Sequence, residues 1–202
     1  DGHVSSFNPD WLATISKISS DSTHYEPLLS SYRLWNRESF KNTYPEVAYE
    51  DLQTGTDGIR RWADQIKQFG FGIVSGCPIL PKGDVSSSQK IMEKLGPLRR
   101  TFFEPNGVWD FTVNQEKAKM EHADTAYTNF HLPPHVDGTY FSESPGLQFF
   151  QIPEHIGEGG ETILVDGFQV GNFMDQHHTE LFDYLSAFPM PFHYYEEGVS
   201  LR

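Results

Sequence analysis

His135 and Asp137 are the two residues of this chain whose types and spacing best suit metal chemistry. They are two positions apart, so in an extended segment both side chains project toward the same side. Non-haem Fe(II) centres hold iron on one face with two His and one carboxylate, which leaves the opposite positions open. The pair would supply two of these three ligands. A His and an Asp at this spacing also occur by chance in solvated loops, and that alternative stays open.

The segments that flank this pair favour a rigid setting for it. Pro133-Pro134 precedes the pair and restricts the backbone angles of the approach. Gly138–Phe141 and Leu147–Ile152 are rich in β-branched and aromatic residues. This composition predicts a strand in each of the two segments.

The pattern upstream of the pair predicts a helix over residues 58–69. Asp57 is expected to cap this helix and Gly70 to end it. Residues 1–50 are rich in Ser, Asn, Pro and Tyr, so we expect an extended connection with short helical pieces. Apolar residues recur at helical spacing within the predicted helix, namely Ile59, Trp62, Ala63 and Ile66.

The rest of the chain predicts more strands than helices. Residues 71–74 are expected to form a buried strand, and a second helix over about 86–95 should stop at the Gly-Pro pair that follows. From about residue 125, short apolar runs separated by Gly, Pro and Glu predict an antiparallel sheet, interrupted by helices within about 168–187. Residues 192–196 resemble one more strand. The pattern alone supports a mixed, mainly β domain.

Length and composition exclude several classes of protein. A chain of 202 residues can bury one substantial core, and the default is one domain. No apolar run approaches the roughly 18 residues that a membrane helix needs. A net charge of -13 with scattered Lys and Arg argues against a nucleic-acid partner. The single Cys77 excludes an intramolecular disulfide, fits a reducing compartment and is expected to lie in the core.

Six short motifs occur in order along the second half of the chain: Asp124–Thr128, His135–Asp137, Thr139–Phe141, Pro145–Gln148, Gly159–Thr162 and Leu164–Phe168. Together they resemble the Fe(II)/2-oxoglutarate dioxygenases of carnitine biosynthesis, which are TauD-like enzymes. The resemblance implies a mainly β fold with flanking helices, a double-stranded β-helix or jelly roll, here incomplete at its C-terminal end. It also implies that residues 1–50 are a linker from a missing N-terminal zinc-type domain, and that residues 51–202 are the N-terminal part of the dioxygenase domain.

The resemblance implies Fe(II) held by His135 and Asp137, with 2-oxoglutarate and O₂ as co-substrates and ascorbate as a candidate reductant. Enzymes of this family supply the second His, and an Arg that pairs with 2-oxoglutarate, well over a hundred residues downstream. Only 65 residues follow Asp137 here. We therefore expect a fragment that is inactive by itself. Structural roles are favoured over metal ligation for the later histidines, His155, His177, His178 and His193.

Four further residues resemble binding positions of the family. Thr162 matches a hydroxyl that contacts the 2-oxoglutarate carboxylate, although a strand Thr that only fills space is the alternative. Tyr127 and Trp109 resemble members of an aromatic box that recognises a quaternary ammonium by cation–π attraction, with a core role as the rival for Trp109. Asp124 stands where relatives that act on butyrobetaine carry Asn, and an ionised carboxylate suits an α-ammonium. A helix cap or turn is the alternative for Asp124.

His3 resembles the last ligand of a structural zinc site whose other ligands are three Cys. Those Cys are absent, and structural zinc needs four ligands, so His3 is expected to be an orphan ligand. Asp1 opens the chain without an initiator Met or a signal segment. A mitochondrial and a cytoplasmic location therefore both stay open, as does a homodimer.

The activity implied by the resemblance is Fe(II)- and 2-oxoglutarate-dependent hydroxylation of N6-trimethyllysine at C3, in carnitine biosynthesis. Hydroxylation of γ-butyrobetaine is the nearest alternative. A rival from another class is a catalytically dead jelly-roll module that keeps the aromatic box but lacks a complete metal triad. The partner of either enzyme would be a small molecule, with no nucleic acid and no membrane.

Overall fold

The structure is a computed structural model. It describes residues 31–41, 43–81, 83–102, 107–110, 130–196 and 198–201, together with the single residues 9, 126 and 128. His3, Asp124 and Tyr127 lie outside the described residues, so their predicted roles stay predictions.

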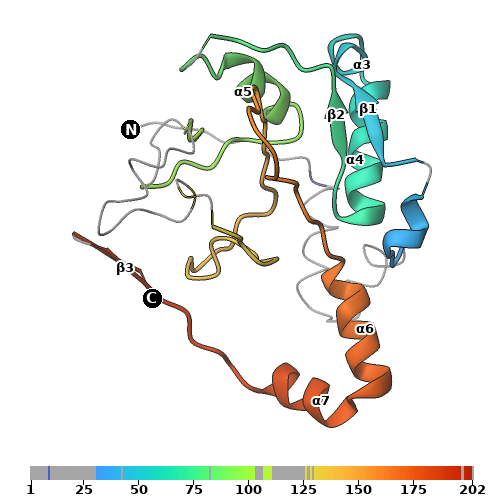
Figure 1. Ribbon diagram of the computed structural model, residues 1–202, viewed down its shortest axis with the longest axis vertical. Helices are drawn as coiled ribbons and strands as arrows, with labels where there is room; N and C mark the ends of the chain where they lie inside the picture. Colours follow the sequence, from blue (N-terminus) through green and yellow to red (C-terminus); the bar gives the residue numbers. More distant parts are fainter. Residues whose placement is uncertain are drawn as a thin grey trace.

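Helices and short strands form the regular structure of the described part. Their order is η2 (Arg37–Phe40), β1 (Glu46–Ala48), α3 (Tyr49–Gln53), α4 (Asp57–Phe69), β2 (Ile73–Ser75), α5 (Ser86–Met92), α6 (Gly167–His177), α7 (Thr179–Ala187), β3 (Tyr194–Glu196) and β4 (Val199–Leu201). Figure 1 shows α3, α4, β1 and β2 grouped at one end of the molecule, and α6 and α7 as an arm at the other. None of the described helices is long and apolar enough to cross a membrane.

The two sheets differ in how their strands are joined. β1 and β2 are parallel, with Val47 opposite Val74, and the chain between them passes through α3 and α4. Parallel neighbours need such a crossover, and a helix usually provides it. β3 and β4 are antiparallel and are joined by a tight connection that includes Gly198 at φ +84°.

Helix α4 confirms the prediction made from its apolar spacing. It runs Asp57–Phe69 and ends at Gly70, whose φ of +77° is the left-handed conformation that glycine adopts without steric cost. The predicted cap was wrong, because Thr56 takes the N-cap position and Asp57 is the first helical residue. Trp62 is buried on the inner face, whereas Ala63 is exposed.

The core of the described part lies between this helix, β1 and α5. Val47, Leu52, Trp62 and Ile91 are buried there. Partly buried side chains pack around these four, namely Tyr49, Ile59, Ile66, Val74, Cys77, Leu95 and Phe149. Cys77 is therefore at the margin of the core, and burial raises the pKa of its thiol. The predicted second helix ends early, since α5 stops at Met92 and turns continue to Gly96.

The strands predicted beside the metal pair do not form a sheet in the described part. Gly138–Phe141 is a turn, closed by a 3.1 Å hydrogen bond from Phe141 N to Gly138 O, with Gly138 at φ +73°. Among the described residues, none forms a strand ladder with residues 147–152. All four described strands are three residues long, so the mainly β prediction is not confirmed.

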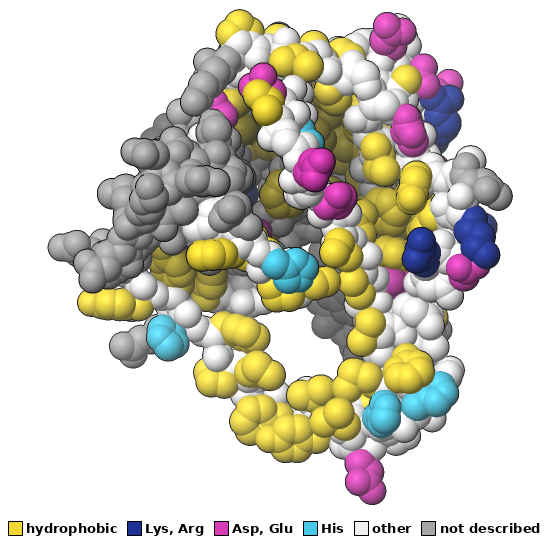
Figure 2. Space-filling view, viewed as in Figure 1, with side chains coloured by type: hydrophobic (Ala, Val, Ile, Leu, Met, Phe, Trp, Pro, Cys, Tyr) yellow, Lys and Arg dark blue, Asp and Glu magenta, His cyan; other side chains and the backbone are white. Residues whose placement is uncertain are grey.

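A ladder needs a second strand, and apolar side chains without one remain open to solvent. Large apolar side chains of residues 147–152 and 163–165 are exposed, including Phe150 at 69% and Ile152 at 64%. Figure 2 shows apolar side chains spread over the molecule around an opening beside the α6–α7 arm. The apolar residues predicted to form the sheet faces are therefore present, but their side chains are exposed to solvent.

Candidate metal site

The His135 and Asp137 side chains face each other across the motif predicted to bind metal. His135 Nε2 lies 3.4 Å from Asp137 Oδ1, and the two side chains are 53% and 51% exposed. The other ring nitrogen of His135, Nδ1, lies 2.7 Å from the carbonyl oxygen of Pro133. A carbonyl can only accept a hydrogen bond, so Nδ1 carries a proton and donates it.

This arrangement determines which species can lie between His135 Nε2 and Asp137 Oδ1. With Nδ1 protonated, a neutral His135 presents the lone pair of Nε2 to an Asp137 oxygen that also only accepts. Two acceptors in contact repel each other unless a cation lies between them. A second ring proton or a metal ion meets this requirement, and neutral imidazole with carboxylate is a donor set that suits Fe(II).

The separation of the two atoms also suits a shared metal ion. Ligand bonds to a divalent transition metal are about 2.1 Å long. Two ligands at right angles on such an ion are then about 3 Å apart, close to the 3.4 Å between Nε2 and Oδ1. His135 and Asp137 therefore fit two neighbouring positions of a metal site.

A third side chain contacts this pair. The Gln148 side-chain amide Nε2 donates to Asp137 Oδ2 over 2.7 Å. Gln148 also lines a cavity of about 470 Å³ between β2 and residues 148–153. The wall of this cavity is largely apolar, with Phe71, Val74 and Phe149 among its residues. The metal pair is therefore linked, through one amide, to a space large enough for a small molecule.

Aromatic packing holds the turn that follows the metal pair. The Tyr140 and Tyr194 ring centroids are 4.9 Å apart, and Phe102 lies 5.3 Å from Tyr194. The Arg99 guanidinium lies 4.7 Å from the centroid of the Phe141 ring, within cation–π range. β3 and the segment near residue 100 thus contact the turn directly after Asp137. The sequence patterns gave no sign of this cluster, since its members come from three separate segments.

Two of the other predicted site residues, Thr162 and Trp109, lie in the described part of the chain. Thr162 is exposed and Trp109 is half-buried. His177 Nδ1 donates to Phe173 O within α6 over 3.0 Å, which is a structural role as expected. Within the ranges that the structure describes, no three His, Cys, Asp or Glu side chains gather to hold a metal ion. The second His of the predicted triad is therefore not found among those residues.

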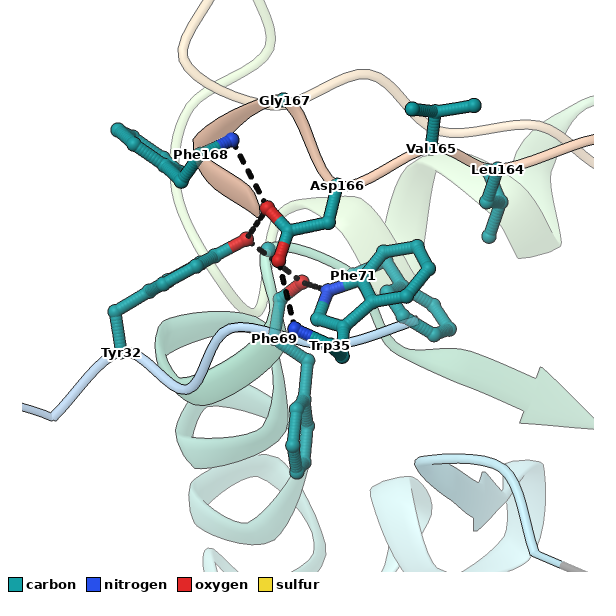
Figure 3. Close-up of a pocket in the computed structure, with 10 residues that line it drawn as sticks. Tyr32, Trp35, Phe69, Phe71, Leu164, Val165, Asp166, Gly167 and Phe168 are labelled. Atoms are coloured by element: carbon teal, nitrogen blue, oxygen red, sulfur yellow. Dashed lines mark hydrogen bonds between the residues drawn. The ribbon is translucent and has the colours of Figure 1, made fainter. Parts of the chain in front are cut away.

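A separate aromatic pocket lies around Asp166, at the start of α6 (Figure 3). The pocket encloses about 410 Å³, and Tyr32, Trp35 and Phe168 line it together with Asp166. Asp166 is buried and accepts four hydrogen bonds. They come from Tyr32 OH at 2.9 Å, Trp35 N at 2.8 Å, Phe168 N at 3.0 Å and Gln169 N at 3.1 Å. The carboxylate therefore caps α6 and ties residues 32–35 to it.

The same contacts change the ionisation of Tyr32. Burial raises the pKa of Tyr32 to about 12, and the hydrogen bond to Asp166 and the negative charge of that carboxylate act in the same direction. Because both oxygens of Asp166 are used by protein donors, its role is structural. Asp166 belongs to the Leu164–Phe168 motif, but its residue type and spacing indicate no role by themselves.

Comparison with known proteins places the chain in a family. The model of the taurine catabolism dioxygenase TauD, TfdA family matches residues 27–200. The chain belongs to the TauD/TfdA family. Fe(II) and 2-oxoglutarate follow from that membership, and so does a double-stranded β-helix, whereas the described residues show only two two-stranded sheets.

Several curated relatives of this TauD/TfdA chain are named trimethyllysine dioxygenase. One from Meyerozyma guilliermondii is 34% identical over 194 residues, which are 94% of this chain and 45% of the relative. The mitochondrial protein of that name from Bos taurus is 30% identical over 97% of this chain and 43% of its own length. A gamma-butyrobetaine dioxygenase from Pongo abelii is 26% identical over 93% of this chain and 45% of its own length. The chain thus spans less than half the length of these relatives. No solved structure matches the chain.

Proposed function

We propose that this TauD/TfdA chain serves the Fe(II)- and 2-oxoglutarate-dependent hydroxylation of N6-trimethyllysine at C3, in carnitine biosynthesis. The observation that carries the proposal is that His135 Nε2 and Asp137 Oδ1 face each other 3.4 Å apart in a chain of a family that implies Fe(II). The names of the more similar relatives support the choice of trimethyllysine. We include a mitochondrial or a cytoplasmic location of the protein in this proposal.

In this proposal, different residues of the chain bind the metal and the 2-oxoglutarate. His135 and Asp137 would hold Fe(II) through Nε2 and Oδ1, and the ion would supply the activation of O₂ that hydroxylation requires. Thr162 donates its hydroxyl to a 2-oxoglutarate carboxylate. The exposure of Thr162 leaves that hydroxyl accessible to a ligand.

The substrate is recognised at its two ends. Tyr127, together with Trp109, offers aromatic faces to the trimethylammonium, a group that has no N–H to donate and is bound by cation–π attraction. Asp124 accepts from the α-ammonium at the other end of trimethyllysine. Butyrobetaine carries the same quaternary ammonium but has a carboxylate in place of an amino acid end, and an ionised Asp124 repels that carboxylate.

The test is substrate choice in the full-length protein. Asp124→Asn is expected to lower kcat/KM for trimethyllysine and to maintain or raise kcat/KM for butyrobetaine, so the two substrates respond in opposite directions. Thr128→Ser, in the same segment, is the matched control. Equal losses for both substrates would show that Asp124 is structural and would remove the support for trimethyllysine.

A second candidate function is the hydroxylation of γ-butyrobetaine, favoured by the relative named for that activity. Succinate formation that depends on Fe(II), 2-oxoglutarate and one of the two substrates separates the candidates directly. A protein that binds both quaternary ammonium compounds but forms succinate with neither would instead be a binding module.

A further inference from the structure

Gln148 makes the side-chain contact that holds the carboxylate of the metal pair, and neither the motif nor the comparisons assigns it a role. Its amide nitrogen donates to Asp137 Oδ2 over 2.7 Å. The other oxygen of that carboxylate, Oδ1, is the one that faces His135 Nε2. The two oxygens of Asp137 are therefore distinguished by their partners.

Such a contact matters because a carboxylate is otherwise free to turn. The terminal torsion of an Asp side chain has a broad and nearly two-fold preference, so neither oxygen is favoured by the chain itself. At 51% exposure, Asp137 is not fixed by packing. A donor bound to Oδ2 sets the plane of the carboxylate and leaves Oδ1 directed toward His135.

His135 has a supporting hydrogen bond of the same kind. The carbonyl of Pro133 binds the Nδ1 proton and leaves Nε2 free. Each member of the pair thus uses one polar atom to bind a neutral protein group, and its other atom faces the shared position. Metal-binding imidazoles and carboxylates commonly have such supporting hydrogen bonds.

The chemical type of Gln148 is also suitable. An amide donates a hydrogen bond without adding charge, so Asp137 keeps its negative charge for a divalent ion. A Lys or Arg at this position would donate equally well but would repel the metal. The turn at Gly138–Phe141 lies between the two residues along the chain.

We propose that Gln148 is a positioning residue of the metal site, whose amide holds Asp137 Oδ1 toward the metal beside His135 Nε2. The inference rests on the proposed function, from which it takes the metal. Loss of the amide should weaken metal binding without disturbing the fold, because Gln148 is exposed.

The test measures binding of Mn²⁺ alone, without 2-oxoglutarate or substrate. Mn²⁺ broadens nearby proton signals in NMR spectra even at low occupancy, and the His135 ring signals are assigned by their loss in His135→Gln. Gln148→Leu should raise the Mn²⁺ concentration needed to broaden them about 10-fold, the smaller end of the effect expected for a supporting hydrogen bond. The thermal midpoint of the metal-free protein should not change.

Gln151→Leu is the matched control, three residues along the same segment. The Gln151 amide contacts Ser88 and the carbonyl of Pro78, and no described contact joins it to Asp137. This variant should lower the thermal midpoint and leave the Mn²⁺ concentration unchanged. In an Asp137→Asn background, Gln148→Leu should have no further effect on Mn²⁺, since the carboxylate that it positions is gone.

Two results overturn the inference. If Asp137→Asn weakens Mn²⁺ binding but Gln148→Leu stays within twofold of the parent, the metal site stands and Gln148 does not position it. Equal weakening by Gln148→Leu and Gln151→Leu would show general loosening of the segment, which also refutes a positioning role. If Mn²⁺ broadens His135 no more than the other histidines, the metal site itself fails and the inference fails with it.

Discussion

Replacement of Asp166 should destabilise the protein by an amount that can be worked from its four hydrogen bonds. Asp166→Ala removes the cap of α6, which costs about 1 kcal/mol. It also leaves Trp35 N without its acceptor and leaves Tyr32 OH with only the longer 3.4 Å contact to Phe69 O, at about 1 kcal/mol for each lost hydrogen bond. Together these losses lower the free energy of unfolding by about 3 kcal/mol.

The more conservative Asp166→Asn separates the contribution of the helix cap from that of the hydrogen bond to Trp35 N. Asp166 Oδ1 accepts from three donors and Oδ2 from Trp35 N alone, so the new amide nitrogen should take the Oδ2 position. Asn caps helices as well as Asp does, which preserves the contacts with Phe168 N and Gln169 N. We expect a loss of about 1 kcal/mol, from the donor that now meets Trp35 N.

Urea unfolding followed by tryptophan fluorescence measures these differences, because the Trp35 ring lines the Asp166 pocket. Asp183→Asn on the exposed side of α7 is the control and should change the free energy of unfolding by less than about 0.5 kcal/mol. If Asp166→Ala is no worse than Asp166→Asn, the helix cap contributes nothing. If neither differs from the control, the reasoning that joins residues 32–35 to α6 is refuted.

Three other results are expected. The stability that the Tyr32 hydroxyl contributes should be fully present below pH 10 and lost as the pH rises toward about 12, because the folded-state pKa is raised above the ordinary value of 10.0. The difference in unfolding free energy between the parent and Tyr32→Phe, measured at several pH values, should therefore shrink over that window. A constant difference would contradict this expectation. Gly58→Ala should lower the free energy of unfolding by about 2 kcal/mol although Ala favours helices, because the added Cβ would lie 2.2 Å from Asp51 O. A more stable variant in thermal melts would show that the structure relaxes to relieve this contact. The isolated chain should bind the dye ANS and associate with rising concentration through exposed side chains such as Phe150 and Ile152, and a monodisperse monomer in light scattering would refute this.

Local patterns predicted the local elements and failed where partners lie far apart in sequence. The spacing of Ile59, Trp62 and Ile66 gave helix α4, because an amphipathic helix is encoded within its own residues. The strand predicted at Gly138–Phe141 was wrong, since the positive φ of Gly138 turns the chain there in spite of its strand-forming neighbours. A ladder depends on a second segment that a periodicity cannot reveal.

The same distinction applies to the candidate metal site. The spacing of His135 and Asp137 within one segment was sufficient to predict that they face each other. The amide of Gln148 was not predictable in this way, because its contact with Asp137 depends on the turn between them. The aromatic cluster around Tyr194 was also missed, since it joins segments about 40 residues apart or more.

The hydrogen bonds to Asp166 also have a consequence for the order in which the chain folds. Tyr32 and Trp35 are 134 and 131 residues away from their acceptor, so closing this contact costs more chain entropy than any step within α4. During synthesis at about 5–20 residues per second, the ribosome needs on the order of 10 s to travel from Trp35 to Asp166. Over that interval the Trp35 backbone N–H lacks its acceptor on Asp166, whereas Arg33 N and Trp35 Nε1 can already donate to Gln68 O and Phe69 O at the end of α4. Residues 32–35 can therefore pack against the end of α4 first, and their closure onto α6 through Asp166 is a later event on the ribosome.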